Sequence, residues 1–98
     1  MPTTLEELER LLLASRETPG LEFKEAKNQL AQEALFEYAV AIANERGGRL
    51  VLGVTNASPR RVVGTAAFRN PASVEGKVLQ VLGFRVEIEE LAHPNGRC

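Results

Sequence analysis

The spacing of apolar residues predicts an amphipathic helix and then a short strand in the first quarter of the chain. The helix is expected over residues 5–15, because leucines recur there at intervals of three or four positions. Thr4 and Glu7 have the spacing of a capping box, in which a hydroxyl and a carboxylate satisfy the first helical turn. A Pro19-Gly20 turn follows, and residues 21–24 then alternate apolar and charged, which predicts a half-buried strand.

The longest helical pattern runs over residues 28–46. Asn28 is placed to act as its N-cap, and Gly47-Gly48 is placed to end it with positive φ angles. Residues 39–43 are apolar around the whole circumference of this helix. A helix with that pattern is expected to be buried on more than one side and to lie at the centre of the fold.

The middle of the chain predicts a β-hairpin and a third helix. Residues 50–55 form a continuous apolar run, which is typical of a strand covered on both faces. Residues 61–64 form a second short strand after a turn, so the two segments predict a hairpin. The third helix is expected over residues 71–83, with Pro71 in its first turn and Gly83 at its end.

The last fifteen residues predict a strand and a tight turn. Residues 84–89 alternate apolar and charged, and Asn95-Gly96 is a strong turn signal after such a strand. The returning strand is expected to begin at Arg97 or Cys98, so we expect the chain to be a piece of a longer polypeptide whose C-terminal strand or strands are missing. An 84–90 strand without a neighbour would expose an unpaired edge, which favours a homodimer through that edge.

These elements together predict an α+β fold with a small mixed sheet of about four strands packed with two to three helices. The domain is expected over residues 5–98, after a short tail at residues 1–4. The length of 98 residues, with 44% hydrophobic and 26% charged residues, fits one folded domain. No apolar run approaches the roughly 20 residues of a membrane helix, no signal peptide is visible, and Cys98 has no partner for a disulfide. We therefore expect a cytoplasmic protein without membrane association.

The charges are distributed unevenly although the net charge is only −1. Residues 1–45 carry nine glutamates against four basic residues, whereas residues 46–98 carry four glutamates against eight. No acidic residue occurs between Glu45 and Glu75, and this acid-free window contains Arg46, Arg49, Arg60, Arg61 and Arg69. Such a window is a candidate surface for phosphate contacts. An equally open reading is a solvated surface on which the arginines pair with the acidic helices.

Three short signatures occur in order: Glu17-x-x-x-x-Glu22-Phe23-Lys24-Glu25, Ala43-Asn44-x-x-Gly47-Gly48 and Leu52-Gly53-Val54-Thr55-Asn56, followed by Val63-Gly64. At these separations they resemble the schlafen-type AlbA domain, also described as a divergent AAA-type domain, over about residues 5–90. The resemblance implies an α+β domain at the N-terminus of longer bacterial proteins, described as transcriptional regulators or helicase-related ATP-binding proteins. DNA binding is proposed for them. This chain shows no P-loop, since no Gly-Lys-Ser or Gly-Lys-Thr follows the paired glycines, and we expect no cofactor.

Ribonucleases of the wider schlafen family carry two glutamates and a later aspartate in a metal-assisted site. Glu17 and Glu22 match the two glutamates, which makes them weak catalytic candidates. The aspartate position corresponds to Asn56 or Thr55, and neither side chain carries charge. A neutral amide binds a hard cation more weakly than a carboxylate does, and the chain contains no aspartate. Only Glu25 could stand in, so we expect no metal site and favour a structural or surface role for the two glutamates.

The remaining signature residues suggest either close packing or contact with a ligand. Asn44, Gly47, Gly48 and Gly53 form the structural motif, in which glycines permit a sharp turn and close backbone approach. We expect tight packing to explain them. The candidate nucleic-acid contacts are Lys24 and the five arginines of the acid-free window, with Arg60 and Arg61 at or beside an exposed hairpin tip.

Three functions follow from these observations. The leading one is a nucleic-acid-binding domain that recognises the phosphate backbone by charge, with DNA favoured over RNA as the partner. The second is metal-dependent RNA cleavage by a degenerate site that includes Glu17 and Glu22. The third is an interaction module that dimerises through a sheet edge.

Overall fold

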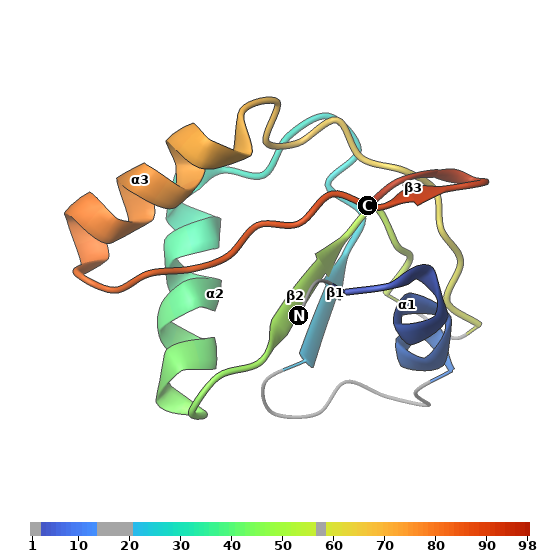
Figure 1. The fold of residues 1–98 in the computed structure, drawn as a ribbon, viewed down its shortest axis with the longest axis horizontal. Helices are drawn as coiled ribbons and strands as arrows, with labels where there is room; N and C mark the ends of the chain where they lie inside the picture. The colour runs from blue at the N-terminus through green and yellow to red at the C-terminus, as the bar shows by residue number, and fades with distance from the viewer. Residues whose placement is uncertain (1–2, 14–20, 57–58) are drawn as a thin grey trace.

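The structure is a computed structural model, and it describes residues 3–13, 21–56 and 59–98. In chain order its elements are α1 (Leu5–Leu12), β1 (Leu21–Lys24), α2 (Gln32–Asn44), β2 (Arg49–Leu52), α3 (Pro71–Leu82), β3 (Ala92–His93) and β4 (Gly96–Arg97). Figure 1 shows β1 and β2 side by side at the centre, with α2 on one flank and α1 on the other. None of the helices in the described ranges is long and apolar enough to cross a membrane.

The first and third helices begin at the residues that their sequences predict, although the carboxylate of the predicted capping box, that of Glu7, contacts Arg49 instead of the first helical turn. The hydroxyl of Thr4 accepts a hydrogen bond of 3.1 Å from the backbone N–H of Glu7 at the start of α1. The side chain of Asn70 accepts one of 3.2 Å from the backbone N–H of Ser73 at the start of α3. Gly83 ends α3 in the left-handed conformation, as expected for a residue without a Cβ. The predicted extension of α1 to residue 15 falls partly outside the described residues.

Helix α2 differs from its prediction in its start and in its burial. It begins at Gln32 after Ala31, and no side chain caps it, so the predicted cap by Asn28 is wrong. The loop before α2 is instead fixed by a hydrogen bond to another segment of the chain. The backbone N–H of Ala66 donates this bond, of 2.8 Å, to the carbonyl of Lys27. The expected burial on several sides is also wrong, because Val40 is 40% exposed. The helix covers the strands with one face only.

The parallel pair β1–β2 is the centre of the fold. Its register runs from Leu21 opposite Arg49 to Lys24 opposite Leu52, and α2 forms the crossover between the two strands. The predicted hairpin after β2 is reduced to one antiparallel bridge between Val54 and Val62. Gly53 causes this change, since its φ of +85° turns the chain out of the direction of β2.

A C-terminal hairpin is present one residue earlier than predicted, but the strand predicted before it is not. Strands β3 and β4 pair antiparallel with Pro94 and Asn95 as the two turn residues between them, so the returning strand begins at Gly96 and not at Arg97 or Cys98. Leu91 and Cys98 extend this ladder with two backbone hydrogen bonds of 3.0 Å. Residues 84–90 form no regular strand. The α+β class with three helices is confirmed, whereas the strands of the described residues form two sheets of two strands instead of one sheet of four.

The hydrophobic core lies on one face of the β1–β2 pair. Phe23, Val54 and Val62 are buried together, and α1 contributes Leu11 and Leu12 to this cluster. Phe23, an apolar position of the predicted 21–24 strand, is 3% exposed. The core therefore joins β1, the bridge after β2 and the first helix.

A candidate nucleic-acid interface

The parallel strands place two of the predicted basic contacts at opposite ends of the sheet. Lys24 ends β1 opposite Leu52, whereas Arg49 begins β2 opposite Leu21. Three residues of strand separate these levels, which corresponds to about 10 Å. Both side chains belong to exposed residues. A ligand that contacts both must therefore follow the length of the strands.

The turn between α2 and β2 carries the first two arginines of the acid-free window. Asn44 is the last residue of α2, and Gly47 and Gly48 have φ angles of +109° and +155°, as the sequence predicts. Arg46 is exposed and forms no ion pair within the described ranges. The Arg49 guanidinium lies 3.4 Å from the carboxylate of Glu7 in α1, and its side chain is 47% exposed. Arg49 thus pairs with an acidic helix, whereas Arg46 does not.

Arg60 does not occupy the exposed tip that its sequence position suggests. The residue is only 8% exposed, and its guanidinium lies 4.4 Å from the centroid of the Phe23 ring. A cation over an aromatic face is stabilised by the ring quadrupole, most strongly where water is excluded. Arg60 therefore belongs to the core packing around β1, and the hypothesis that it reaches into a groove is wrong for this conformation.

Arg61 and Arg69 remain exposed on the segments that follow β2. The backbone N–H of Arg61 donates a hydrogen bond of 2.9 Å to the hydroxyl of Thr55, which fixes the loop but leaves the guanidinium outside. Within the described part of the chain, neither arginine forms an ion pair. The ammonium group of Lys24 lies 5.9 Å from the centroid of the Tyr38 ring.

The exposed arginines do not gather at one point. Figure 1 shows the C-terminal end of α2 and the segment after residues 57–58 on different sides of the two strands. Arg46 belongs to the first of these regions and Arg61 to the second. The structure therefore places these arginines at separate positions and not around a single point.

The two weak catalytic candidates, Glu17 and Glu22, cannot both be placed among the described residues. Glu22 lies in β1 and is half-buried, while Glu17 falls outside the described residues. The hydroxyl of Thr55 is used within the loop by Arg61, and Asn56 is exposed. The residues that the structure describes contain no group of three potential ligands able to hold a metal ion.

Glycines of the signatures serve two different purposes. A Cβ added at Gly53 would lie 2.8 Å from the carbonyl oxygen of Arg97 and 3.1 Å from the backbone of Gly64. A Cβ at Gly47 would meet nothing within 4 Å. Gly53 is therefore required for close packing, whereas Gly47 serves the backbone conformation of the turn. Gly96 was noted only as a turn residue, yet its Cβ would lie 2.6 Å from the Cα of Gly64.

The role of Arg97 could not be read from its position after a turn. Its guanidinium donates hydrogen bonds to the carbonyl oxygens of Thr65, Ala67 and Phe68 at 3.2, 2.6 and 2.8 Å. It also contacts the carboxylate of Glu90 at 2.7 Å. This one side chain fixes the segment that connects the bridge to α3, so it serves the fold and is not part of the exposed basic surface.

Comparison with known proteins agrees with the signature residues. The family described as "Schlafen, AlbA_2" matches residues 17–92, which is more than three quarters of the chain. The chain belongs to the schlafen AlbA_2 family. Neither the curated proteins nor the solved structures gave a match. Membership of the schlafen AlbA_2 family indicates a nucleic-acid-related domain.

Proposed function

We propose that this schlafen AlbA_2 domain binds nucleic acid through its phosphate backbone, with DNA as the preferred ligand. The observation that carries the proposal is the exposure of Arg46, Arg61 and Arg69 without a carboxylate partner in the described ranges. Arginine donates several hydrogen bonds in a fixed planar geometry that matches phosphate oxygens. An unpaired arginine also gives up no ion pair when it binds.

The extended placement of these arginines supports recognition of charge along a strand or duplex. Contacts to phosphates fix the orientation of a protein on nucleic acid without reading its sequence. The net charge of −1 sets the overall attraction low, so binding depends on this local surface. We accordingly expect weak sequence preference and strong dependence on salt concentration.

The test is a triple charge reversal, Arg46→Glu, Arg61→Glu and Arg69→Glu, measured by fluorescence anisotropy with labelled duplex DNA and structured RNA. Each phosphate contact contributes a slope of about −0.9 to the plot of log affinity against log salt for duplex DNA. We expect the wild-type slope to lie near −3 and the variant to lose most of its affinity. Arg60 is left unchanged because its burial against Phe23 would make its reversal disrupt the fold.

A matched control separates the proposed surface from net charge. Arg10→Glu, Lys77→Glu and Arg85→Glu change three exposed basic residues outside the acid-free window, so the net charge falls by the same amount. The control variant is expected to retain most of the affinity. Equal loss in both variants, or no binding by wild type at low salt, would contradict the proposal. Tighter binding to RNA than to DNA would overturn the choice of ligand.

A further inference from the structure

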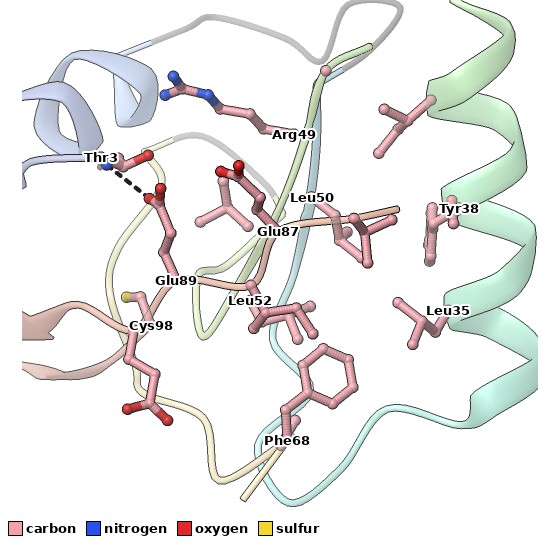
Figure 2. Close-up of a pocket in the computed structure, with 18 of the residues that line it drawn as sticks. Thr3, Leu35, Tyr38, Arg49, Leu50, Leu52, Phe68, Glu87, Glu89 and Cys98 are labelled. Atoms are coloured by element: carbon pink, nitrogen blue, oxygen red, sulfur yellow. Dashed lines mark hydrogen bonds between the residues drawn. The ribbon is translucent and has the colours of Figure 1, made fainter. Parts of the chain in front are cut away.

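An apolar groove of about 600 Å³ runs beside β2. Figure 2 shows Leu50 and Leu52 of β2 facing Leu35 and Tyr38 of α2 across this groove. The opposite wall is the segment 84–91, which carries Val86 and Ile88 into the lining. The groove is therefore bounded by a strand, a helix and an extended segment, all with apolar side chains.

The hydrogen-bond pattern of β2 shows that one of its edges faces this groove. The backbone N–H of Gly53 donates a bond of 2.9 Å to the carbonyl of Lys24, so Gly53 faces β1. Backbone groups of successive residues in a strand point to alternate sides, and this places those of Leu50 and Leu52 on the other edge. Among the described residues, no strand pairs with that edge.

The opposite wall has the complementary arrangement. Strands β3 and β4 pair Ala92 with Arg97, and the ladder continues through the two bonds between Leu91 and Cys98. In the same antiparallel register, the backbone groups of Glu87 and Glu89 point into the groove. The N–H of Ile88 points the other way, since it donates a bond of 2.7 Å to the carboxylate of Glu75.

The alternation in residues 84–89 now has an explanation. The segment has the sequence pattern of a strand, and its exposed and half-buried residues alternate as in a strand, but it lacks a neighbour in the described part of the chain. One strand placed in the groove would pair with β2 on one side and with this segment on the other. The result would be a mixed sheet of four strands in which the new strand is antiparallel to both neighbours.

We propose that the groove accepts one further β-strand, and that this strand is polypeptide joined directly to Cys98. The register of the hairpin defines the path of this strand. Because Leu91 lies opposite Cys98, the first residue added after Cys98 would lie opposite Glu90 and the fifth would lie opposite Val86. Cys98 itself lines the groove, so a continuing chain enters it without a turn. Helices α1 and α2 both contribute apolar side chains to the lining, so such a strand is expected to be rich in β-branched residues such as valine and threonine, which pack well in sheets.

The test attaches a six-residue extension, Lys-Val-Thr-Val-Thr-Val, to Cys98 of the full chain. The measured quantity is the hydrogen-exchange rate of the Leu50 and Leu52 amides, with the Gly53 amide, which is bonded to Lys24, as an internal reference for an intact fold. We expect exchange at Leu50 and Leu52 to slow at least tenfold, and the melting temperature to rise. The matched control has proline at the second and fourth added positions and should show neither effect, because proline donates no hydrogen bond.

Two further measurements test whether the groove binds a separate peptide or a second copy of the chain instead. The same six-residue peptide added free in solution at millimolar concentration should protect these amides much less than the attached one. Equal protection by the free peptide would overturn the proposal in favour of a partner in trans. Protection in the unextended chain that rises with protein concentration, together with dimer formation in sedimentation, would instead assign the groove to a second copy. No change in the extended chain, with Gly53 still protected, would exclude a strand at this edge.

Discussion

The C-terminal end of β2 and its outer edge have opposite kinds of packing. Where the strand ends, the backbone of Gly53 meets Arg97 and Gly64 so closely that a methyl group would lie 2.8 Å from an oxygen. Along the outer edge, Leu50 and Leu52 face a groove of about 600 Å³. Backbone against backbone closes the first region, whereas large side chains without a strand between them leave the second open. One short strand thus ends in a closely packed region and borders an open groove along its outer edge.

This comparison separates residues that maintain the fold from residues that await a partner. Substitutions at the closed end should cost much stability, because neither backbone can move without breaking other bonds. Substitutions along the open edge should cost little, because few contacts exist there to lose. Measured stabilities can therefore break or sharpen the distinction, and the largest difference is expected at Gly53.

Replacing Gly53 with alanine should destabilise the domain by about 4 kcal/mol, since strain at positive φ and overpacking each cost about 1–3 kcal/mol. The new Cβ would contact the Arg97 carbonyl, which already accepts a bond of 2.8 Å from Thr65. Urea unfolding followed by circular dichroism measures the change. Gly76→Ala is the control, because this helical glycine has open space around it and should gain about 0.5–1 kcal/mol. Similar stability of Gly53→Ala and wild type would show that the end of β2 is not closely packed.

The Arg97 side chain provides the second test of the closed region. Arg97→Met keeps much of the aliphatic length but removes the donors to three carbonyl oxygens and to Glu90. We expect a loss of about 2 kcal/mol, because a hydrogen bond from a charged donor contributes about 1.5–3 kcal/mol net and the Arg97 side chain, at 32% exposure, can recover part of this by bonding to water. Arg85→Met is the matched control on an exposed residue and should stay within about 0.5 kcal/mol of wild type. A variant of Arg97 as stable as this control would contradict the role assigned to its guanidinium.

How far the sequence predicted the molecule follows from the same contrast. Local signals were reliable: the hydroxyl cap at Thr4, strand β1 and the start of α3 at Pro71 occur as predicted, and a tight turn lies one residue before the predicted Asn95-Gly96 position. These features depend on neighbours within a few residues, so a short pattern suffices to define them. The prediction of a strand at residues 84–89 was wrong, because a strand forms only where another segment of the fold supplies a hydrogen-bonding partner. An alternating sequence alone cannot supply that partner.

The candidate site was predictable only in its composition. Arg46, Arg61 and Arg69 of the acid-free window are exposed in the structure, and their role in binding stays a prediction. It could not show that Arg60 turns inward, because this depends on the Phe23 ring, which lies 37 positions earlier in the chain. Nor could charge patterns show that Arg97 bonds carbonyl groups, since backbone acceptors carry no signature in the sequence. Long-range contacts of single side chains were therefore the part that the sequence left open.

The smallest predicted effect concerns the attachment of the segment 84–91, the outer wall of the groove. The carboxylate of Glu89 accepts a hydrogen bond of 2.7 Å from the backbone N–H of Thr3, and this contact lowers the pKa of Glu89. A lowered pKa in the folded state stabilises the fold above the ordinary carboxyl pKa, and the contribution disappears as pH falls through the lowered value.

Because Glu89 is exposed, Glu89→Gln should cost only about 0.5 kcal/mol or less at pH 7. The cost should shrink at an acidic pH below the lowered pKa of Glu89, because both proteins then carry a neutral side chain at this position. Glu87→Gln is the control, since the described residues give its carboxylate no hydrogen bond. Urea unfolding at both pH values decides: a cost that persists at low pH, or one shared by the control, would show that the wall is held by other contacts.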